Sequence, residues 1–390
     1  MTGDETNATG SGGHGGSGGT EPTGDATVAV VTRPGGDEAY AEPIERFLKV
    51  LSPATRRVHL LAGDGVGARV DGTANGWSSL GSGEYTGSGV VDYALVQLVV
   101  VWYLVKLRRE TDLVYFHKGA MGFTLPVLVA RALGLPTCVI KVGAFATERE
   151  GGTAGWSVQA VDTAQRLAIR FATATVVFTE RERASVPSDR VYVSYSNYRD
   201  FDRWTARTPF DERAYTVGFV GRFATEKGIS VAAAAIERLV DEQTDRTACL
   251  IGDGAELDAV TARFADTERV TVPGWIDHDD LHRWFDDIQV LIVPSEGEGL
   301  PTTIIEAMGS ETVVVATPVG SIPDLVRDGE TGFLLESTAV DDVTATTERV
   351  LSRDDLPAIG ARARETVTER YTLSAARERF ATITAALSRT

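Results

Sequence analysis

The chain has 390 residues, a length typical of two domains, and its 43% hydrophobic content excludes disorder over the whole length. Its 38 basic and 55 acidic residues give a formal net charge of −17, which excludes partners such as nucleic acid whose binding depends on neutralising phosphates. Two cysteines are too few for a disulfide framework, and their spacing matches no metal-binding motif.

The basic residues are mostly arginine, because only five of the 38 are lysine. An acidic, lysine-poor surface is typical of proteins that must stay hydrated in high salt, so the composition indicates a halophilic source. An ordinary acidic cytosolic protein is the alternative interpretation.

The first 26 residues contain nine glycines and no aromatic residue, which predicts a disordered Gly/Ser-rich tail. This tail lacks the apolar central region of a signal peptide. We therefore expect the protein to be cytoplasmic.

From residue 27 onward, short apolar runs alternate with amphipathic helical patterns. Strands are expected at Val28–Thr32, Arg57–Leu61, Leu113–Phe116, Thr137–Val142, Ala174–Thr179 and Val191–Tyr195. Between them, Ala39–Leu51 and Gly122–Leu133 have the spacing of helices. This alternation predicts a parallel sheet wound with helices.

The most apolar stretch of the chain is Val90–Leu107. Asp92, Gln97 and Lys106 interrupt it, so its uninterrupted part is too short to span a bilayer. We expect a helix that is buried against the sheet. Peripheral contact with the inner face of a membrane is the alternative.

The second half repeats the same alternation. Strands are expected at Thr216–Val220, Ala248–Ile251, Val270–Val272, Val290–Val293, Val313–Ala316 and Gly332–Leu334. Helical patterns at Ser230–Gln243 and Ala255–Ala265 separate some of these strands, and Ala361–Ser388 has a helical pattern that breaks near Arg370.

These patterns predict an N-terminal Rossmann-like domain at 27–200, a linker at 201–213 and a C-terminal Rossmann-like domain at 214–370. A final helix at 371–390 is expected to pack back on the N-terminal domain. The predicted fold class is α/β, with two doubly wound domains that face a central cleft. Open parallel sheets bind ligands at the carboxyl ends of their strands, so the cleft is where a site is expected.

The segment after the strand at Val290–Val293 combines a glycine turn with a helix start. Free amides at such a start bind phosphate, which favours an anion-binding site at Gly299, Leu300, Pro301, Thr302 and Thr303. Glu298 and Glu306 lie eight residues apart, and carboxylates can bind vicinal hydroxyls of sugars through two hydrogen bonds. A solubilising acidic loop is the alternative.

A pair of cations follows the strand at Thr216–Val220. Arg222 comes directly after a glycine turn, and Lys227 precedes the next helical pattern. Two cations at the end of one strand can hold a diphosphate, although two solvated surface cations would give the same pattern. The later turn Gly252–Gly254 lacks the third glycine of a dinucleotide site, because Leu257 stands there.

In this order and spacing, the motifs resemble the group 1 family of retaining glycosyltransferases, which have the two-domain GT-B fold. The resemblance covers most of residues 27–385 and is strongest in the second half. The segments that carry it are Gly218–Arg222 with Glu226–Gly228, Leu250–Gly254, Val272–Ile276, the two glutamates at 298 and 306, Ala316–Gly320, Ile322–Pro323 and Asp328–Gly332.

The resemblance implies transfer of a sugar from a nucleotide-diphosphate-sugar, with retention at the anomeric carbon. It makes Glu298, Arg222 and Lys227 catalytic and assigns Glu306 to the ribose. Ile276 would line the nucleotide base, and the backbone of Gly35 and Gly36 would approach the donor. No cofactor and no metal are expected, because the cations supply the positive charge.

On the acceptor side, the resemblance offers His117 and Lys141, each near a strand end. Many members have a histidine where this chain has Val142, so the usual acceptor-side group is missing there. The acceptor is not identified and could be a glycan, a lipid-linked molecule or a small molecule. Alternative functions on the same fold are a nucleotide-sugar epimerase, a glycosyl phosphorylase or a silent nucleotide-sugar-binding protein.

Overall fold

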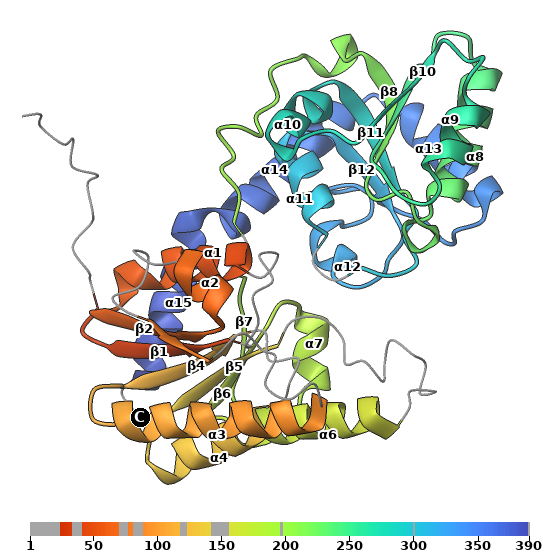
Figure 1. Cartoon of the computed structure of the whole chain (residues 1–390). Coiled ribbons are helices and arrows are strands. Elements are labelled where there is room, and N and C mark those ends of the chain that lie inside the picture. The colour runs from red at the N-terminus through yellow and green to blue at the C-terminus, as the bar shows by residue number, and fades with distance from the viewer. Residues whose placement is uncertain are drawn as a thin grey trace, which may run out of the picture.

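The computed structural model describes residues 24–32, 41–69, 77–80, 89–117, 123–141, 156–195, 198–298 and 301–388. Within them, the chain forms two parallel β-sheets, each with helices on both faces (Figure 1). The predicted fold class, two doubly wound α/β domains, is therefore confirmed. The tail expected at 1–26 lies outside the described residues up to residue 23.

Seven strands form the first sheet in the described part of the chain, in the order β3-β2-β1-β4-β5-β6-β7. They are β1 (Thr27–Val31), β2 (Arg57–Ala62), β3 (Trp77–Ser79), β4 (Leu113–His117), β5 (Thr137–Ile140), β6 (Ala174–Val177) and β7 (Val191–Val193). All residues of β1, β4, β5 and β6 are buried, as expected for a parallel sheet that is covered on both faces.

Helices cover this sheet in two layers. They are α1 (Ala41–Leu51), α2 (Asp64–Arg69), α3 (Gly89–Leu107), α4 (Thr124–Ala132), α6 (Trp156–Phe171) and α7 (Glu180–Ser185), with a short 3₁₀ turn at Ser52–Ala54. Alternate strand residues face opposite layers. Val28 and Val30 pack in the cluster with α1, whereas Ala29 and Val31 pack in the cluster with α3 and α4.

Six strands form the second sheet in the described residues, in the order β10-β9-β8-β11-β12-β13. They are β8 (Tyr215–Val220), β9 (Ala248–Ile251), β10 (Val270–Gly274), β11 (Ile288–Val293), β12 (Val313–Ala316) and β13 (Phe333–Leu334). Strands β8 and β11 are neighbours at the centre, with Val290 opposite Val217. The order reverses direction between them, which is where ligands bind in sheets of this kind.

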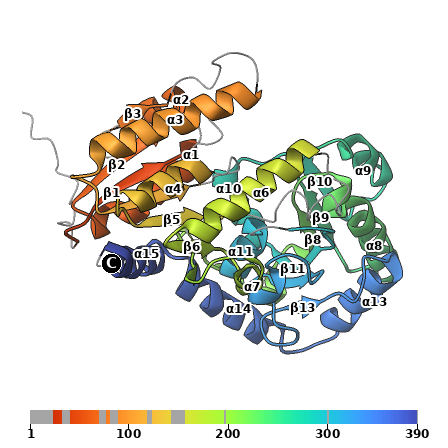
Figure 2. The ribbon, with the colours of Figure 1, turned by 90° about the horizontal axis from the view of Figure 1, so that it is seen from below.

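The helices of the second half surround that sheet, except for the last, α15, which packs on the first sheet. They are α8 (Ile229–Glu242), α9 (Leu257–Arg263), α10 (His278–Asp286), α11 (Thr302–Gly309), α12 (Ile322–Leu325), α13 (Val340–Leu351), α14 (Leu356–Tyr371) and α15 (Leu373–Ser388), with 3₁₀ turns at Phe210–Glu212 and Thr225–Lys227. Helices α8 and α13 contact each other, and α14 packs on α11 and β12. Figure 2 shows α14 and α13 beside the second sheet and α15 beside the first.

The chain passes between the two domains twice, at 194–214 and again between α14 and α15. The amide of Arg199 donates a hydrogen bond to the carbonyl oxygen of Tyr371 at 2.7 Å, which joins the two passages. Helix α15 then packs on α1 and β4, where the hydroxyl oxygens of Tyr115 and Thr384 lie 2.8 Å apart.

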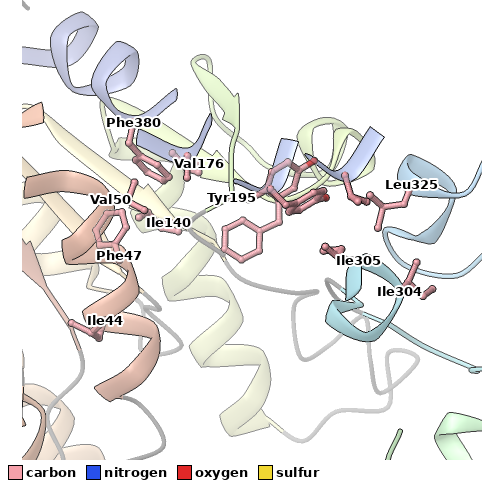
Figure 3. Packing of buried hydrophobic residues seen from close by; sticks show 14 of the residues in the cluster. Ile44, Phe47, Val50, Ile140, Val176, Tyr195, Ile304, Ile305, Leu325 and Phe380 are labelled. Carbon is pink, nitrogen blue, oxygen red and sulfur yellow. The ribbon is translucent and has the colours of Figure 1, made fainter. Parts of the chain in front are cut away.

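One buried hydrophobic cluster extends through this junction (Figure 3). On the side of the first sheet, the rings of Phe47 and Phe380 have centroids 5.2 Å apart. Next to them, the ring centroids of Tyr195 and Tyr371 are 4.8 Å apart. Ile304 of α11 belongs to the same cluster. The two domains therefore share part of their hydrophobic core.

All twelve strands expected from apolar runs are present, with ends that shift by a few residues. The strand β3 was not predicted. It is three residues long, and Trp77 is followed by Ser78 and Ser79, so no apolar run marks it. Its pairing with β2 at the edge of the sheet decides its conformation.

Candidate active site

A cavity of about 180 Å³ lies at the carboxyl ends of β8 and β11. These strands are neighbours, so the loops that follow them meet at one edge of the sheet. The lining residues come from the ends of both strands, from the loops that follow them and from the start of α11: Phe219, Val220, Gly221, Arg222, Lys227, Val293, Ser295, Glu298, Pro301, Thr302, Thr303 and Ile304. Of the eight described residues that were predicted to act on or bind a donor, the structure therefore brings six together at this cavity.

An ion pair between Lys227 and Glu298 lies at this cavity. The ammonium nitrogen of Lys227 is 2.8 Å from each carboxylate oxygen of Glu298. The hydroxyl of Ser295 donates to Glu298 Oε1 at 2.8 Å. Both charged side chains are mostly shielded from solvent, so the geometry of the pair is held by its surroundings.

A close backbone contact holds the two loops together. The amide of Glu296 donates to the carbonyl oxygen of Glu226 at 3.0 Å. Gly228 has a φ of +70°, and a Cβ there would lie 2.2 Å from the carbonyl oxygen of Pro294. Only glycine allows both this conformation and this approach, so Gly228 is what lets Lys227 reach Glu298.

The loop after β12 supports Glu298 from another direction. Gly320 has a φ of +58°, and a Cβ there would lie 1.9 Å from the carbonyl oxygen of Glu298. The amide of Thr317 donates to Val293 at the end of β11. Three loops thus fix the position of one carboxylate.

Arg222 lies at the end of β8 and lines the same cavity. Its side chain is about two-thirds exposed, and its nearest charged partner is Glu226 at 3.5 Å. A contact of this length between exposed groups is weak, so Arg222 can turn toward an anion at little cost in free energy.

The first turn of α11 supplies the remaining part of the cavity wall. The helix begins at Thr302, and Thr302 and Thr303 both line the cavity. Amides of a first helical turn precede the intrahelical hydrogen bonds and carry part of the positive end of the helix dipole. They add to the positive potential of the two cations.

Glu306 lies one turn further along α11 and is not among the residues that line this cavity. It is buried, and its Oε1 accepts hydrogen bonds from Arg199 Nε at 2.6 Å and contacts His278 Nε2 at 3.0 Å. Arg199 belongs to the first passage between the domains. The sequence assigned Glu298 to the transferred sugar and Glu306 to the ribose, and of the two only Glu298 lines this cavity.

Arg199 and His278 were not singled out from sequence. Both also line a larger cavity of about 410 Å³ next to α1 and α10. Arg199 and His278 come together because the segment that joins the domains packs against α10 and α11. No local sequence pattern indicates this contact. Ser295 was missed as well, although it lies within the motif three residues before Glu298.

Comparisons with known proteins show the family of this chain. A family model for group 1 glycosyl transferases matches residues 214–353. A 2-deoxystreptamine glucosyltransferase from Streptomyces kanamyceticus is 30% identical over 273 residues, which are 63% of this chain and 70% of that protein. The chain belongs to the group 1 glycosyltransferases.

Another relative is an alpha-D-kanosaminyltransferase from the same organism, 28% identical over 303 residues, or 71% of this chain and 78% of the relative. Solved structures with the same fold include HepE from Anabaena in complex with UDP, with a TM-score of 0.71 and 17% identity over 93% of this chain and all of that one. Sucrose-phosphate synthase from Thermosynechococcus elongatus has a TM-score of 0.69 and 17% identity over 93% and 99% of the two chains.

In this group 1 glycosyltransferase, Ile276 follows β10 and packs partly against the core cluster that contains Phe285. It does not line the cavity with Glu298. The turn at Gly252 connects the two regions, because the amide of Gly252 donates to Gly274 and the amide of Phe223 donates to Asp253.

The two residues proposed on the acceptor side lie at the ends of neighbouring strands β4 and β5. His117 is buried and stacks on Phe47, with ring centroids 4.7 Å apart. Lys141 is also buried and pairs with Glu182 Oε1 at 3.0 Å, while Glu182 Oε2 accepts from the amide of Phe178. These contacts bind both side chains into the N-terminal domain.

Some predicted positions lie outside the described residues. These are Gly35, Gly36, Val142, Gly299 and Leu300. Among the residues that the structure does describe, no group of three or more His, Cys, Asp or Glu side chains could hold a metal ion. Searched over the same ranges, the helices include none with the length and apolar character to cross a membrane.

Neither thiol of this glycosyltransferase lies at the cavity. Cys138 and Cys249 are buried within β5 and β9. Burial raises the pKa of both thiols, which keeps them protonated and makes them poor nucleophiles.

Proposed function

We propose that this glycosyltransferase moves a sugar from a nucleoside-diphosphate-sugar to an acceptor, with retention at the anomeric carbon and without a bound metal. The observation that carries the proposal is the cavity in which Lys227, Glu298, Arg222 and the start of α11 meet. Cations, helix amides and a fixed carboxylate are the groups that a charged diphosphate joined to a sugar requires.

The reaction breaks the bond between the anomeric carbon and a diphosphate oxygen, and the electron pair leaves with the diphosphate. Arg222 and Lys227, with the amides of Thr302 and Thr303, would stabilise that negative charge. An ammonium has three N–H donors, so Lys227 can keep its contact with Glu298 and still donate to a phosphate. Losing one preorganised donor of this kind typically lowers the rate about 100- to 1,000-fold.

Glu298 would bind hydroxyls of the transferred sugar, because its carboxylate is fixed at the cavity by Ser295 and Lys227. We propose that Glu306 reaches the ribose only after its contacts with Arg199 and His278 rearrange. Ile276, Pro301 and the glycines at 35, 36 and 299 would complete the donor site with Leu300.

A uridine nucleotide is the donor that we propose. HepE, which shares the fold, has been solved with UDP and with UDP-glucose. The acceptor would bind on the N-terminal side, near His117 and Lys141, and its chemistry is left open.

The protein as a whole is proposed to work inside the cell, in a halophilic organism and at the membrane surface. Its acidic, arginine-rich composition supports the proposal of a high-salt environment. The apolar exposed side of α3 supports the proposal of a membrane contact.

Donor binding measured by titration calorimetry tests the site. Lys227→Met and Arg222→Ala should each weaken the binding of UDP and of UDP-glucose about 10- to 100-fold, since each removes a charge-assisted hydrogen bond. Glu298→Gln should leave UDP affinity nearly unchanged and weaken only UDP-glucose. GDP-glucose is titrated in the same way for comparison, and it should bind more weakly than UDP-glucose.

Arg263→Ala is the matched control, because Arg263 is also an arginine paired with a glutamate at the surface. It should change no affinity. UDP binding that survives both cation variants, or that disappears in EDTA and returns with Mg²⁺, contradicts the proposal. Retention is checked by NMR of the anomeric proton in the product, where inversion would contradict it.

A further inference from the structure

Helix α3 is apolar on both of its sides. Val96, Val100 and Leu104 are buried against the first sheet. The opposite side exposes apolar side chains at steps of four and three residues: Val91, Leu95, Leu98, Trp102 and Val105. Leu98 and Trp102 each leave 56% of their surface exposed. Such a surface costs free energy in water and marks a site of contact.

Two neighbouring helices extend this surface. Helix α4 contacts both α3 and α6, and the three lie together along one side of the first sheet (Figure 1). Leu125 and Leu128 of α4 and Leu167 and Phe171 of α6 are exposed. Of ten large hydrophobic side chains that the described residues expose, nine lie on these three helices. We call this surface the α3 face.

The α3 face is basic, whereas the protein is acidic. Residues 89–110, 124–132 and 156–171 contain three acidic and six basic side chains, a local charge of +3 in a chain of −17. One of the basic side chains, Arg170, forms an exposed ion pair with Asp189. The basic residues are Lys106, Arg108, Arg109, Arg131, Arg166 and Arg170. Five of them are exposed and Arg166 is half-buried.

Apolar and cationic side chains meet at the end of α3. Trp102, Val105, Lys106, Arg108 and Arg109 surround a hollow of about 350 Å³. The ammonium nitrogen of Lys106 lies 5.1 Å from the centre of the Trp102 ring. Tryptophan beside lysine and arginine is the composition that occurs at the boundary between lipid headgroups and acyl chains.

We propose that the α3 face docks on the surface of an anionic lipid bilayer, with α3 lying parallel to it. Leu98 and Trp102 enter the boundary layer, and the cations at 106, 108 and 109 contact lipid phosphates. A second copy of the chain is a poorer partner, because two faces that each carry a positive charge of +3 would repel each other. Since α3 packs on the sheet along one whole side, it lies on the bilayer and does not span it.

This inference deepens the membrane contact in the proposed function and does not depend on the sugar that is transferred. It is tested by flotation of the full chain with vesicles of phosphatidylcholine alone or mixed equally with phosphatidylglycerol. Binding should be at least tenfold stronger to the anionic vesicles at low ionic strength. It should not require donor, and Glu298→Ala should bind as the wild type does.

Two double variants separate the apolar and charged contributions. Leu98→Ser with Trp102→Ser should weaken binding about tenfold or more at any salt concentration, because it removes inserted apolar surface. Arg108→Glu with Arg109→Glu should weaken binding to anionic vesicles about 25-fold or more, and it should have little effect on neutral ones.

Matched controls lie on the other domain. Trp275→Ser removes a tryptophan that is 66% exposed, and Arg263→Glu with Arg283→Glu makes the same change in net charge as the arginine variant at 108 and 109. Neither should alter binding, and circular dichroism checks that every variant is folded.

Three results would overturn the proposal. These are no binding of the wild type to anionic vesicles, equal losses in the controls, or a dimer in sedimentation equilibrium that the variant at Leu98 and Trp102 dissociates. If flotation succeeds while UDP fails to bind, the α3 face stands and the donor site is wrong.

Discussion

At the scale of single residues, two glutamates of one motif have different surroundings. Glu298 lies at the cavity, where Lys227 and Ser295 orient its carboxylate. Glu306 is buried at the domain junction, paired with Arg199 and His278. A buried carboxylate requires such partners, because an unpaired charge in the interior is strongly unfavourable.

Replacing Glu306 should therefore destabilise the fold. Glu306→Ala removes the carboxylate that pairs with the mostly buried guanidinium of Arg199, and we expect a loss of about 3–5 kcal/mol in the free energy of unfolding. Urea denaturation measures it. In the double variant with Arg199→Met, part of that loss should be recovered, with a coupling energy of about 0.5–3 kcal/mol.

Glu298→Ala is the comparison, since Glu298 is partly open to the cavity. It should cost much less stability. Strictly additive effects of Arg199→Met and Glu306→Ala would show that the pair is not coupled, and the assignment of Glu306 to the junction would then be wrong.

At the scale of elements, the site depends on loops that touch through glycine. The 3₁₀ turn at Thr225–Lys227 ends at Gly228, which lies against Pro294 of the loop after β11. The strands β8 and β11 bring these loops near each other, and the glycine sets the final distance. The position of Lys227 is therefore a property of two loops together.

Gly228→Ala should displace the loop and lower kcat/KM at least about tenfold, because a Cβ cannot occupy the space 2.2 Å from a carbonyl oxygen. Thermal unfolding and donor affinity are measured on the same variant. Affinity for UDP should fall together with Tm.

Gly329→Ala provides the control for backbone conformation. Gly329 has a φ of +73°, close to that of Gly228, but nothing lies within 4 Å of the added Cβ. It should cost about 1–2 kcal/mol of stability from the left-handed conformation alone and leave UDP affinity unchanged. Equal effects of the two variants on UDP affinity would refute the contact.

At the scale of the whole molecule, charge is distributed unevenly. The chain carries −17, yet the donor cavity has two cations and the α3 face has a charge of +3. The remaining surface is correspondingly more acidic. Repulsion among its carboxylates opposes compact folding at low salt.

Thermal stability should therefore increase with KCl concentration. The screening length falls from about 10 Å at 0.1 M to about 3 Å at 1 M, so most of the rise in Tm should occur below 1 M. Circular dichroism melts between 0.1 M and 3 M KCl measure it. A Tm that is flat or falls over this range would count against both the repulsion and the halophilic source.

Much of the fold could be predicted from sequence, because the strands of a covered parallel sheet are continuous apolar runs. The run at Val290–Val293 and the break near Arg370 needed no tertiary information. The edge strand Trp77–Ser79 could not be predicted, since it is short and half polar and exists through pairing with β2.

The part of the donor cavity that is built from sequence motifs could be predicted. Arg222, Lys227 and Glu298 lie in loops that directly follow strands, and topology places strand ends together. Glu306 and Ile276 were predicted for that site and lie outside its lining. Their side-chain directions depend on how α11 and β10 pack, and sequence spacing does not contain that information.

The order of strands and helices, the family motifs and the acidic composition could all be read from the sequence, because they depend on local patterns. Which charges meet depends on the packing of distant segments. The tertiary structure paired Lys227 with Glu298 and Arg199 with Glu306, partners that are 71 and 107 residues apart along the chain. It also gathered three apolar helices into one exposed basic face. Contacts between distant segments depend on packing, which no local pattern records.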